Sequence, residues 1–286
     1  MNRLRNWWRI LNEVMADIDR LNLGLIAAGC AFFGMISIFP AISAIISIFG
    51  IVADPAVVLE QLRLLEDFIP REAYVLLTLQ IGKLLQTSND ALGWTTGLSI
   101  LVAIWTARAG VDAIMRGLNE IYGRPKRGGL RRVLVALLLT VSLVAVAITA
   151  LLAVVISPIL LAFLPLGPYQ LVLAEALRWG LAIAVIVLGL GILYRFGPNA
   201  KGERPRWFTA GAAVVVVGWL VASVLFSLYL SNFANYNRVY GSIGAVMALL
   251  MWFYITAYLV LMGAVLNLRL WRREQRRLNE RARLAD

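Results

Sequence analysis

Residues 208–230 read FTAGAAVVVVGWLVASVLFSLYL, and this run of 23 residues contains no charged side chain. A helix needs about 20 consecutive apolar residues to cross the hydrocarbon core of a bilayer. Five further stretches of the chain are comparably long and carry few or no charges. The six stretches are Leu23–Ile51, Leu92–Ile114, Val133–Leu164, Leu171–Tyr194, Phe208–Leu230 and Ser242–Leu268. A water-soluble domain has no place for six such segments, so the sequence predicts an all-α, polytopic integral membrane protein with six transmembrane helices.

The composition supports this class. Apolar residues make up 61% of the 286 residues and charged residues 15%, whereas typical soluble domains carry about 25% charged residues. Because the spans use most of the chain, no separate soluble domain fits. We divide the chain into an N-terminal segment (residues 1–22), a six-helix transmembrane domain (residues 23–268) and a basic tail (residues 269–286).

The basic residues are unevenly distributed. If six spans alternate across the membrane, 21 of the 27 Lys and Arg residues fall on the side that holds both termini. Cytoplasmic loops are enriched in Lys and Arg, so we predict that both termini are cytoplasmic and that the protein lies in a bacterial inner membrane. Basic segments can also bind nucleic acid. Here, however, the basic residues are spread over every cytoplasmic segment, and no aromatic stacking platform accompanies them. We therefore expect anionic membrane lipids as partners, and no nucleic acid.

Two segments are predicted to be amphipathic helices at the membrane surface. Apolar side chains recur at helical spacing from Trp7 to Leu21, which suits a helix in the cytoplasmic interface or a cap over the ends of the spans. Residues 53–90 contain too many charges to cross and are predicted to form a periplasmic helical hairpin broken at Pro70. The hairpin either floats on the outer leaflet or covers a cavity, and the sequence favours neither.

Pro40 lies near the middle of the first span. Proline removes one backbone hydrogen bond and clashes with the carbonyl four residues earlier. A kink is therefore expected around Ser37 and Pro40, with Ser37 or a neighbouring helix bonding to the freed carbonyl of Ile36. A stripe of small residues over 24–34 favours close helix packing, and a moving hinge at Ser37 and Pro40 is the functional alternative.

The charged side chains of the second span form the candidate site, because charges inside a membrane are costly and mark pathways or partners. Arg108, Asp112 and Arg116 are spaced four residues apart, so they share one helical face and can pair in series. Arg116 is near the cytoplasmic end, whereas Arg108 is deeper and is expected to be neutralised by Asp112. Two hypotheses stay open. One is a structural ion pair between helices, and the other is a cavity for an anionic group such as a lipid phosphate, to which Asn119 adds a hydrogen bond.

Residues for catalysis are poorly supplied. The sequence contains no histidine and one cysteine, and it has no Gly-rich phosphate loop and no suitably spaced pair of carboxylates within a span. Metal-assisted hydrolysis needs metal ligands, and nucleophilic catalysis needs a general base. These residues provide neither. We therefore predict no catalytic residue, no metal, no cofactor and no enzymatic activity.

Five motifs follow one another along the chain. They are Ala27–Pro40, Trp105–Tyr122, Leu193–Asn199 followed by Trp207, Leu228–Ala245, and Gly263–Asn267. Together they resemble the YihY/BrkB family of bacterial inner-membrane proteins. The resemblance implies six transmembrane helices and a link to envelope function, serum resistance and lipid export. The family has also carried a ribonuclease BN label, which these residues do not support.

This chain departs from the family in the last motif. The family commonly has Gly-Ala-Glu-Leu-Asn there, and this chain has Val265 in place of the glutamate. A role of that carboxylate in proton or cation coupling is therefore not carried over.

Two functions follow from these observations. The first is a transporter or flippase-like protein for an anionic lipid or other amphiphile, not driven directly by ATP because no nucleotide-binding motif is present. The second is a non-transporting envelope scaffold that binds lipid or a partner membrane protein. A membrane-bound ribonuclease is a distant third, and a homo-oligomer is also compatible with the sequence.

Overall fold

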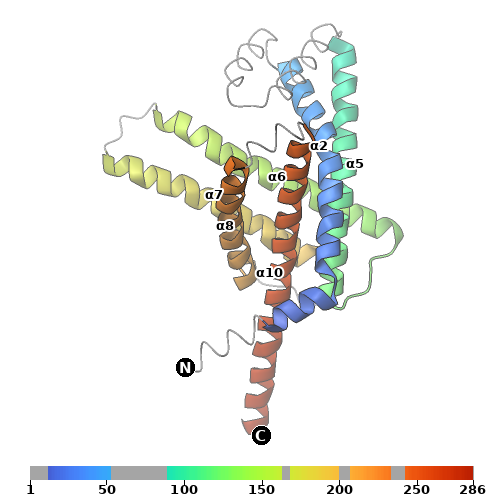
Figure 1. Cartoon of the computed structure of the whole chain (residues 1–286), viewed down its shortest axis with the longest axis vertical. Helices are drawn as coiled ribbons and strands as arrows, with labels where there is room; N and C mark the ends of the chain where they lie inside the picture. The colour runs from blue at the N-terminus through green and yellow to red at the C-terminus, as the bar shows by residue number, and fades with distance from the viewer. Residues whose placement is uncertain (1–11, 53–88, 163–167, 200–206, 233–241, 286) are drawn as a thin grey trace.

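The structure, a computed structural model of the whole chain, describes residues 12–52, 89–162, 168–199, 207–232 and 242–285 (Figure 1). These residues form helices with no strand among them. A short helix, Asn12–Arg20, is followed by six long ones: α2 (Leu23–Val52), α5 (Asn89–Ile121), α6 (Gly129–Ala162), α7 (Pro168–Phe196), α8 (Ala210–Asn232) and α10 (Ser242–Ala285). Each predicted span coincides with one of the long helices, so the predicted fold class is confirmed.

The long helices are apolar enough to cross a membrane. Among the described residues, five helices meet this condition alone, and the number is six if Asn12–Arg20 and Leu23–Ile38 count as one bent span. α2 carries no charged side chain over its 30 residues, which by itself exceeds the length that a bilayer requires. The structure therefore confirms a multi-pass membrane protein. The hairpin predicted at 53–90 lies, apart from its last two residues, outside the described residues.

The short N-terminal helix is set at a bend of 64° to α2. Asn22 lies at this bend with a φ of 49°, a left-handed conformation that asparagine adopts more readily than most residues. Val14 and Ile18 of the short helix are buried in the main core together with Leu268 of α10. The helix therefore caps the ends of the spans, which is one of the two alternatives that the sequence left open.

Small residues bring α2, α5 and α10 together. A Cβ atom placed on Gly110 of α5 would touch α2 at 3.7 Å, and one placed on Gly117 would lie 2.8 Å from Leu261 of α10. Ala27 and Ala31 of α2 are buried. Close approach of backbones is the usual way in which helices associate in lipid, so the small-residue stripe packs as expected.

α2 continues as one helix through Pro40. The Ser37 hydroxyl donates to the carbonyl of Gly34 at 2.7 Å. Of the two alternatives predicted for the carbonyl of Ile36, Ser37 is therefore wrong, and a neighbouring helix stays a prediction. A helical serine can reach only the carbonyls three or four residues before it, and Ile36 is too close in the sequence. A hinge at Ser37 and Pro40 stays a prediction.

The remaining helices complete the bundle. α6 and α7 lie side by side and lean away from α2 and α5 (Figure 1). α8 packs on α10, where the backbones of Gly211 and Gly263 approach so closely that neither position has room for a Cβ atom. α10 continues past its apolar part and projects from the bundle. We call the end that carries this extension, the short N-terminal helix and the loop 122–128 the basic end.

Candidate functional site

Asp112 lies on the face of α5 that meets α6, and its carboxylate is buried. Arg116, one turn along α5, donates from Nε and Nη2 to Oδ2 of Asp112 at 3.1 and 2.9 Å. Arg132, near the start of α6, donates from Nε to Oδ1 at 2.5 Å and from Nη2 to Oδ2. Two guanidinium groups therefore saturate the carboxylate, and Arg132 ties α6 to α5. These contacts fit the structural alternative, an ion pair between helices.

Arg108 does not belong to this cluster. Among the described residues, the ion pairs of Asp112 are with Arg116 and Arg132, so the expectation that Asp112 neutralises Arg108 is wrong. The order of charges along a helix explains the choice. An acidic residue four positions before a basic one pairs better than the reverse order, so Asp112 favours Arg116 over Arg108.

Arg108 lies within the second predicted span, Leu92–Ile114. At 1.5 Å per residue it is about 24 Å along the helix from Leu92 and about 9 Å from Ile114, which places it in the part of the span nearer the basic end. Its guanidinium carbon lies 4.4 Å from the centre of the Trp105 ring, within the range of a cation–π contact. Its Nε atom is buried and has no hydrogen-bond partner among the described residues.

The face of α5 that carries Arg108 also meets α6. Met115 packs there against Ala136 and Leu139 of α6, one turn closer to the basic end than Asp112. Arg108 lies one turn further from the basic end on the same face of α5, and α6 leans away from α5 (Figure 1). Of the three charged residues predicted as a series, the structure therefore brings two together and leaves the deepest one apart.

Asn119 is occupied by a structural contact. Its Oδ1 atom accepts a hydrogen bond from the backbone N–H of Asn199 at 2.7 Å, and the Asn199 side chain donates to the carbonyl of Pro125 at 3.0 Å. These bonds join the loop after α5 to the segment after α7. Asn119 therefore belongs to the contact between these two segments. Arg108 lies eleven positions earlier on the same helix and takes no part in the described contacts of Asn119.

Arg127, which sequence analysis does not single out, connects the same two segments. Its guanidinium donates to the carbonyls of Phe196, Gly197 and Pro198 at 2.9, 2.6 and 2.6 Å. These carbonyls lie at the C-terminal end of α7, where unpaired carbonyls attract cations. Burial lowers the pKa of Arg127, and the nearby charge of Arg131 adds to the effect. The available signal was Gly197-Pro198 after an apolar run, which predicts a helix end.

Asn267 caps the start of α8. Its Oδ1 atom accepts from the backbone N–H of Gly211 at 2.7 Å, and its Nδ2 atom donates to the Thr209 hydroxyl at 3.0 Å. The Thr209 hydroxyl in turn accepts from the backbone N–H of Ala212 at 3.1 Å. A residue of α10 thus satisfies backbone donors that the first turn of α8 leaves unpaired.

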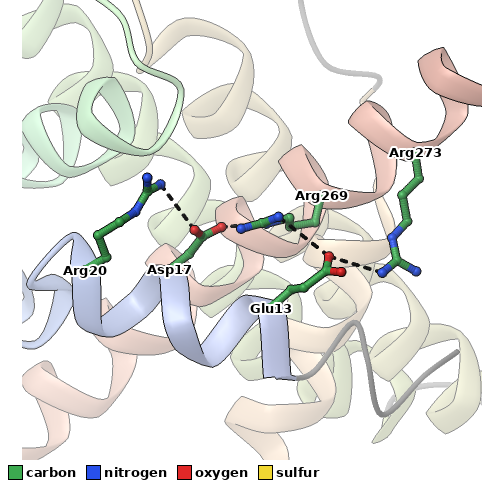
Figure 2. Close-up of polar contacts among 5 residues, drawn as sticks. All are labelled: Glu13, Asp17, Arg20, Arg269 and Arg273. Carbon is green, nitrogen blue, oxygen red and sulfur yellow. Dashed lines mark hydrogen bonds and ion pairs between the residues drawn. The ribbon is translucent and has the colours of Figure 1, made fainter. Parts of the chain in front are cut away.

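A second ionic cluster fixes the short N-terminal helix to α10 (Figure 2). Asp17 accepts from Nε of Arg269 at 2.6 Å and from Nη2 of Arg20 at 3.2 Å. Glu13 lies 3.1 Å from Nη2 of Arg273 and 3.6 Å from Nη1 of Arg269. The hydrogen bond from Arg269 holds the pKa of Asp17 below its ordinary value, against the opposite effect of burial. The sequence does not reveal this pairing, because Asp17 and Arg269 lie 252 positions apart.

The described residues contain no group of three or more His, Cys, Asp or Glu side chains placed to hold a metal ion.

Comparison with known proteins places this architecture in a family. Residues 14–285 match the family model described as virulence factor BrkB. The chain belongs to this family. A ribonuclease-like protein, YfkH, of Bacillus subtilis (strain 168) is 31% identical over 254 residues, which cover 87% of this chain and 90% of that protein. No solved structure matches the chain.

Two further relatives are longer than this chain. A UPF0761 membrane protein of Pseudomonas aeruginosa (strain LESB58) is 38% identical over 112 residues, or 37% of this chain and 27% of that protein. A UPF0761 membrane protein of Psychrobacter sp. (strain PRwf-1) is 23% identical over 268 residues, or 91% of this chain and 48% of that protein. The matches thus span less than half of these two relatives.

Val265 takes a packing role in this BrkB-family protein. It stands where the resemblance would place a glutamate, and it is 1% exposed in the main core. Asn267 two residues later caps α8. The last of the five motifs therefore joins α10 to its neighbours through apolar contacts and one amide side chain.

Proposed function

We propose that this BrkB-family protein is a transporter or flippase-like protein that moves an anionic lipid or amphiphile across the bacterial inner membrane, with both termini in the cytoplasm. The observation that carries the proposal is Arg108. It is an arginine within the second span with no carboxylate partner among the described residues, and its guanidinium lies beside Trp105.

The cost of such a charge is the physical argument. A charged arginine inside a membrane-spanning helix is costly, up to about 3 kcal/mol at the helix centre on insertion scales. Asp112 offsets this cost for Arg116 and Arg132, but not for Arg108. An anionic headgroup that enters the bundle would supply the missing negative charge, and a guanidinium binds phosphate in a two-pronged geometry. The exposed Trp105 ring offers an apolar surface beside this contact.

The source of energy follows from the sequence. The chain has no Gly-rich phosphate loop of the kind that binds nucleotides, so we propose passive or gradient-coupled movement. Val265 in place of a glutamate removes one carboxylate that proton coupling would use.

The test is a lipid-movement assay in proteoliposomes that contain a fluorescent phosphatidylglycerol, whose outer-leaflet population is quenched by dithionite. We expect Arg108→Gln to slow movement at least about tenfold, because an ionic hydrogen bond contributes about 1.5–3 kcal/mol. Arg131→Gln removes the same charge from an exposed position at the start of α6 and should leave the rate unchanged. A folded Arg108→Gln protein with the full rate would contradict the proposal.

An envelope scaffold is the second candidate, and the α10 extension favours it. This extension reaches beyond the spans and is tied to the short N-terminal helix by ion pairs. A stoichiometric membrane partner that co-purifies with the full chain, and is lost when residues 268–286 are deleted, would support this function.

The name of the Bacillus relative suggests a ribonuclease as a third function. The sequence, which has no histidine, offers no base for it. RNA cleavage by purified protein free of soluble nucleases, lost on substitution of a residue of this chain, would be the result in its favour.

A further inference from the structure

The extension of α10 carries more arginines than its ion pairs use. Together with the short N-terminal helix it lines a cleft of about 320 Å³ at the basic end. The lining consists of five arginines of α10, from Arg269 to Arg277, together with Glu13 and Glu280. Positive charges therefore outnumber negative ones in the cleft by three.

The arginines of this cleft fall into two groups. Arg269 and Arg273 are engaged with the carboxylates of the short helix, as Figure 2 shows. Arg272, Arg276 and Arg277 are exposed and form no ion pair with the residues that the structure describes. The first group fixes the wall of the cleft, and the second is available to a ligand.

The position of the cleft suits a ligand at the membrane surface. The apolar part of α10 ends at Leu268, which is buried, and the arginines begin at the next residue. Arg272 and Arg276 are four positions apart and therefore share one helical face, and Arg277 follows Arg276 directly. The cleft thus begins within one turn of the hydrocarbon boundary, at the depth of lipid headgroups.

We propose that this cleft, the α10 cleft, binds a phosphate group through Arg272, Arg276 and Arg277. Guanidinium groups match the oxygens of phosphate in bidentate hydrogen bonds. The ion pairs of Arg269 and Arg273 hold the helix in place before a ligand arrives, which lowers the cost of ordering the site. The phosphate belongs either to the headgroup of an anionic lipid in the adjacent leaflet or to a small soluble phosphorylated compound. This site is separate from Arg108 and does not depend on transport.

The test measures binding to the full chain in uncharged detergent by native mass spectrometry, with two probes: dioctanoyl phosphatidylglycerol and glycerol 3-phosphate. The site variant is Arg276→Gln/Arg277→Gln, and the matched control is Arg281→Gln/Arg283→Gln, which removes the same charge from the same helix beyond the cleft. We expect the site variant to bind the preferred probe at least about tenfold more weakly, as for the loss of an ionic hydrogen bond. The control should keep the affinity of the wild type.

The two probes distinguish the sources of the phosphate. If the site variant loses affinity for the lipid alone, the phosphate belongs to a lipid headgroup. If it loses affinity for glycerol 3-phosphate to the same extent, the phosphate belongs to a soluble compound. Equal losses in the site variant and the control, or no loss in either, would overturn the proposal. If binding of a short single-stranded RNA depends on Arg276 and Arg277 while binding of neither phosphate probe does, the proposal is overturned in favour of a nucleic-acid site. Thermal unfolding should be the same for all three proteins, because the substituted arginines form no ion pair with the described residues.

Discussion

Arg108 and Arg116 lie two turns apart on one face of α5, yet their surroundings are opposite. Arg116 shares the buried carboxylate of Asp112 with Arg132, whereas Arg108 has the Trp105 ring beside it and no carboxylate among the described residues. Toward the basic end, ion pairs between charged side chains join one helix to the next. Further along α5 from the basic end, the charge of Arg108 is left for a partner that the described helices do not supply.

The other polar contacts of the basic end follow the pattern of Arg116. Arg127 binds carbonyls at the end of α7, and Arg269 joins α10 to the short N-terminal helix through Asp17. Removing these contacts should therefore lower stability, whereas removing Arg108 should affect function. The following experiments test this difference.

The largest loss of stability is expected for Asp112→Asn. The substitution leaves Arg116 and Arg132 without their shared carboxylate, and breaking a buried ion pair costs about 3 kcal/mol at the lower end of measured values. The lower end applies because the Arg116 side chain is 57% exposed. Denaturant unfolding in mixed micelles measures this cost. Glu120→Gln, at an exposed position of the same helix, is the control, and a change of less than about 0.5 kcal/mol for Asp112→Asn would remove the structural role.

A smaller loss is expected for Arg127→Gln. The guanidinium serves three carbonyls, and a hydrogen bond to a charged group contributes about 1.5–3 kcal/mol. Because Arg127 is only half-buried and water can replace part of the interaction, we expect the free energy of unfolding to fall by about 2 kcal/mol. The same unfolding assay applies, with Lys126→Gln at the exposed neighbouring position as control. Equal effects of the two substitutions would show that the carbonyl contacts contribute nothing.

The contact between Asp17 and Arg269 should depend on pH. The pKa of Asp17 is lowered in the folded protein, whereas an unfolded aspartate has a pKa of about 3.9. The contact therefore stabilises the fold fully above the unfolded pKa, and this stabilisation is lost as the pH falls through the lower folded pKa. We expect the free energy of unfolding of the wild type to exceed that of Asp17→Asn by about 1 kcal/mol at pH 7. This difference should shrink as the pH falls from 5 to 3. A difference that stays constant over this range would exclude the ionised carboxylate as its cause.

The sequence sufficed for the spans because a bilayer requires a continuous apolar run, and such a run is visible without knowledge of any neighbour. It did not suffice for the partners of the charged residues. Helical spacing shows which side chains share a helix face, and so it suggested Arg108 as a partner of Asp112. The partner that decides the geometry, Arg132, comes from another helix, and Arg269 lies 252 positions from Asp17. Packing between helices sets these pairs, and no local pattern encodes it.

The smallest effect on stability is expected for Arg108→Gln, although this change should have the largest effect on lipid movement. Arg108 leaves no described carboxylate unpaired when it is removed, and glutamine is less costly than arginine inside a membrane. We expect the free energy of unfolding to fall by no more than about 0.5 kcal/mol, in contrast to the loss for Asp112→Asn on the same helix face. Arg108→Lys keeps the charge but not the two-pronged geometry, so it should retain part of the lipid movement. If Arg108→Gln instead destabilises the fold as much as Asp112→Asn does, Arg108 has a structural partner and the contrast between the two arginines of α5 disappears.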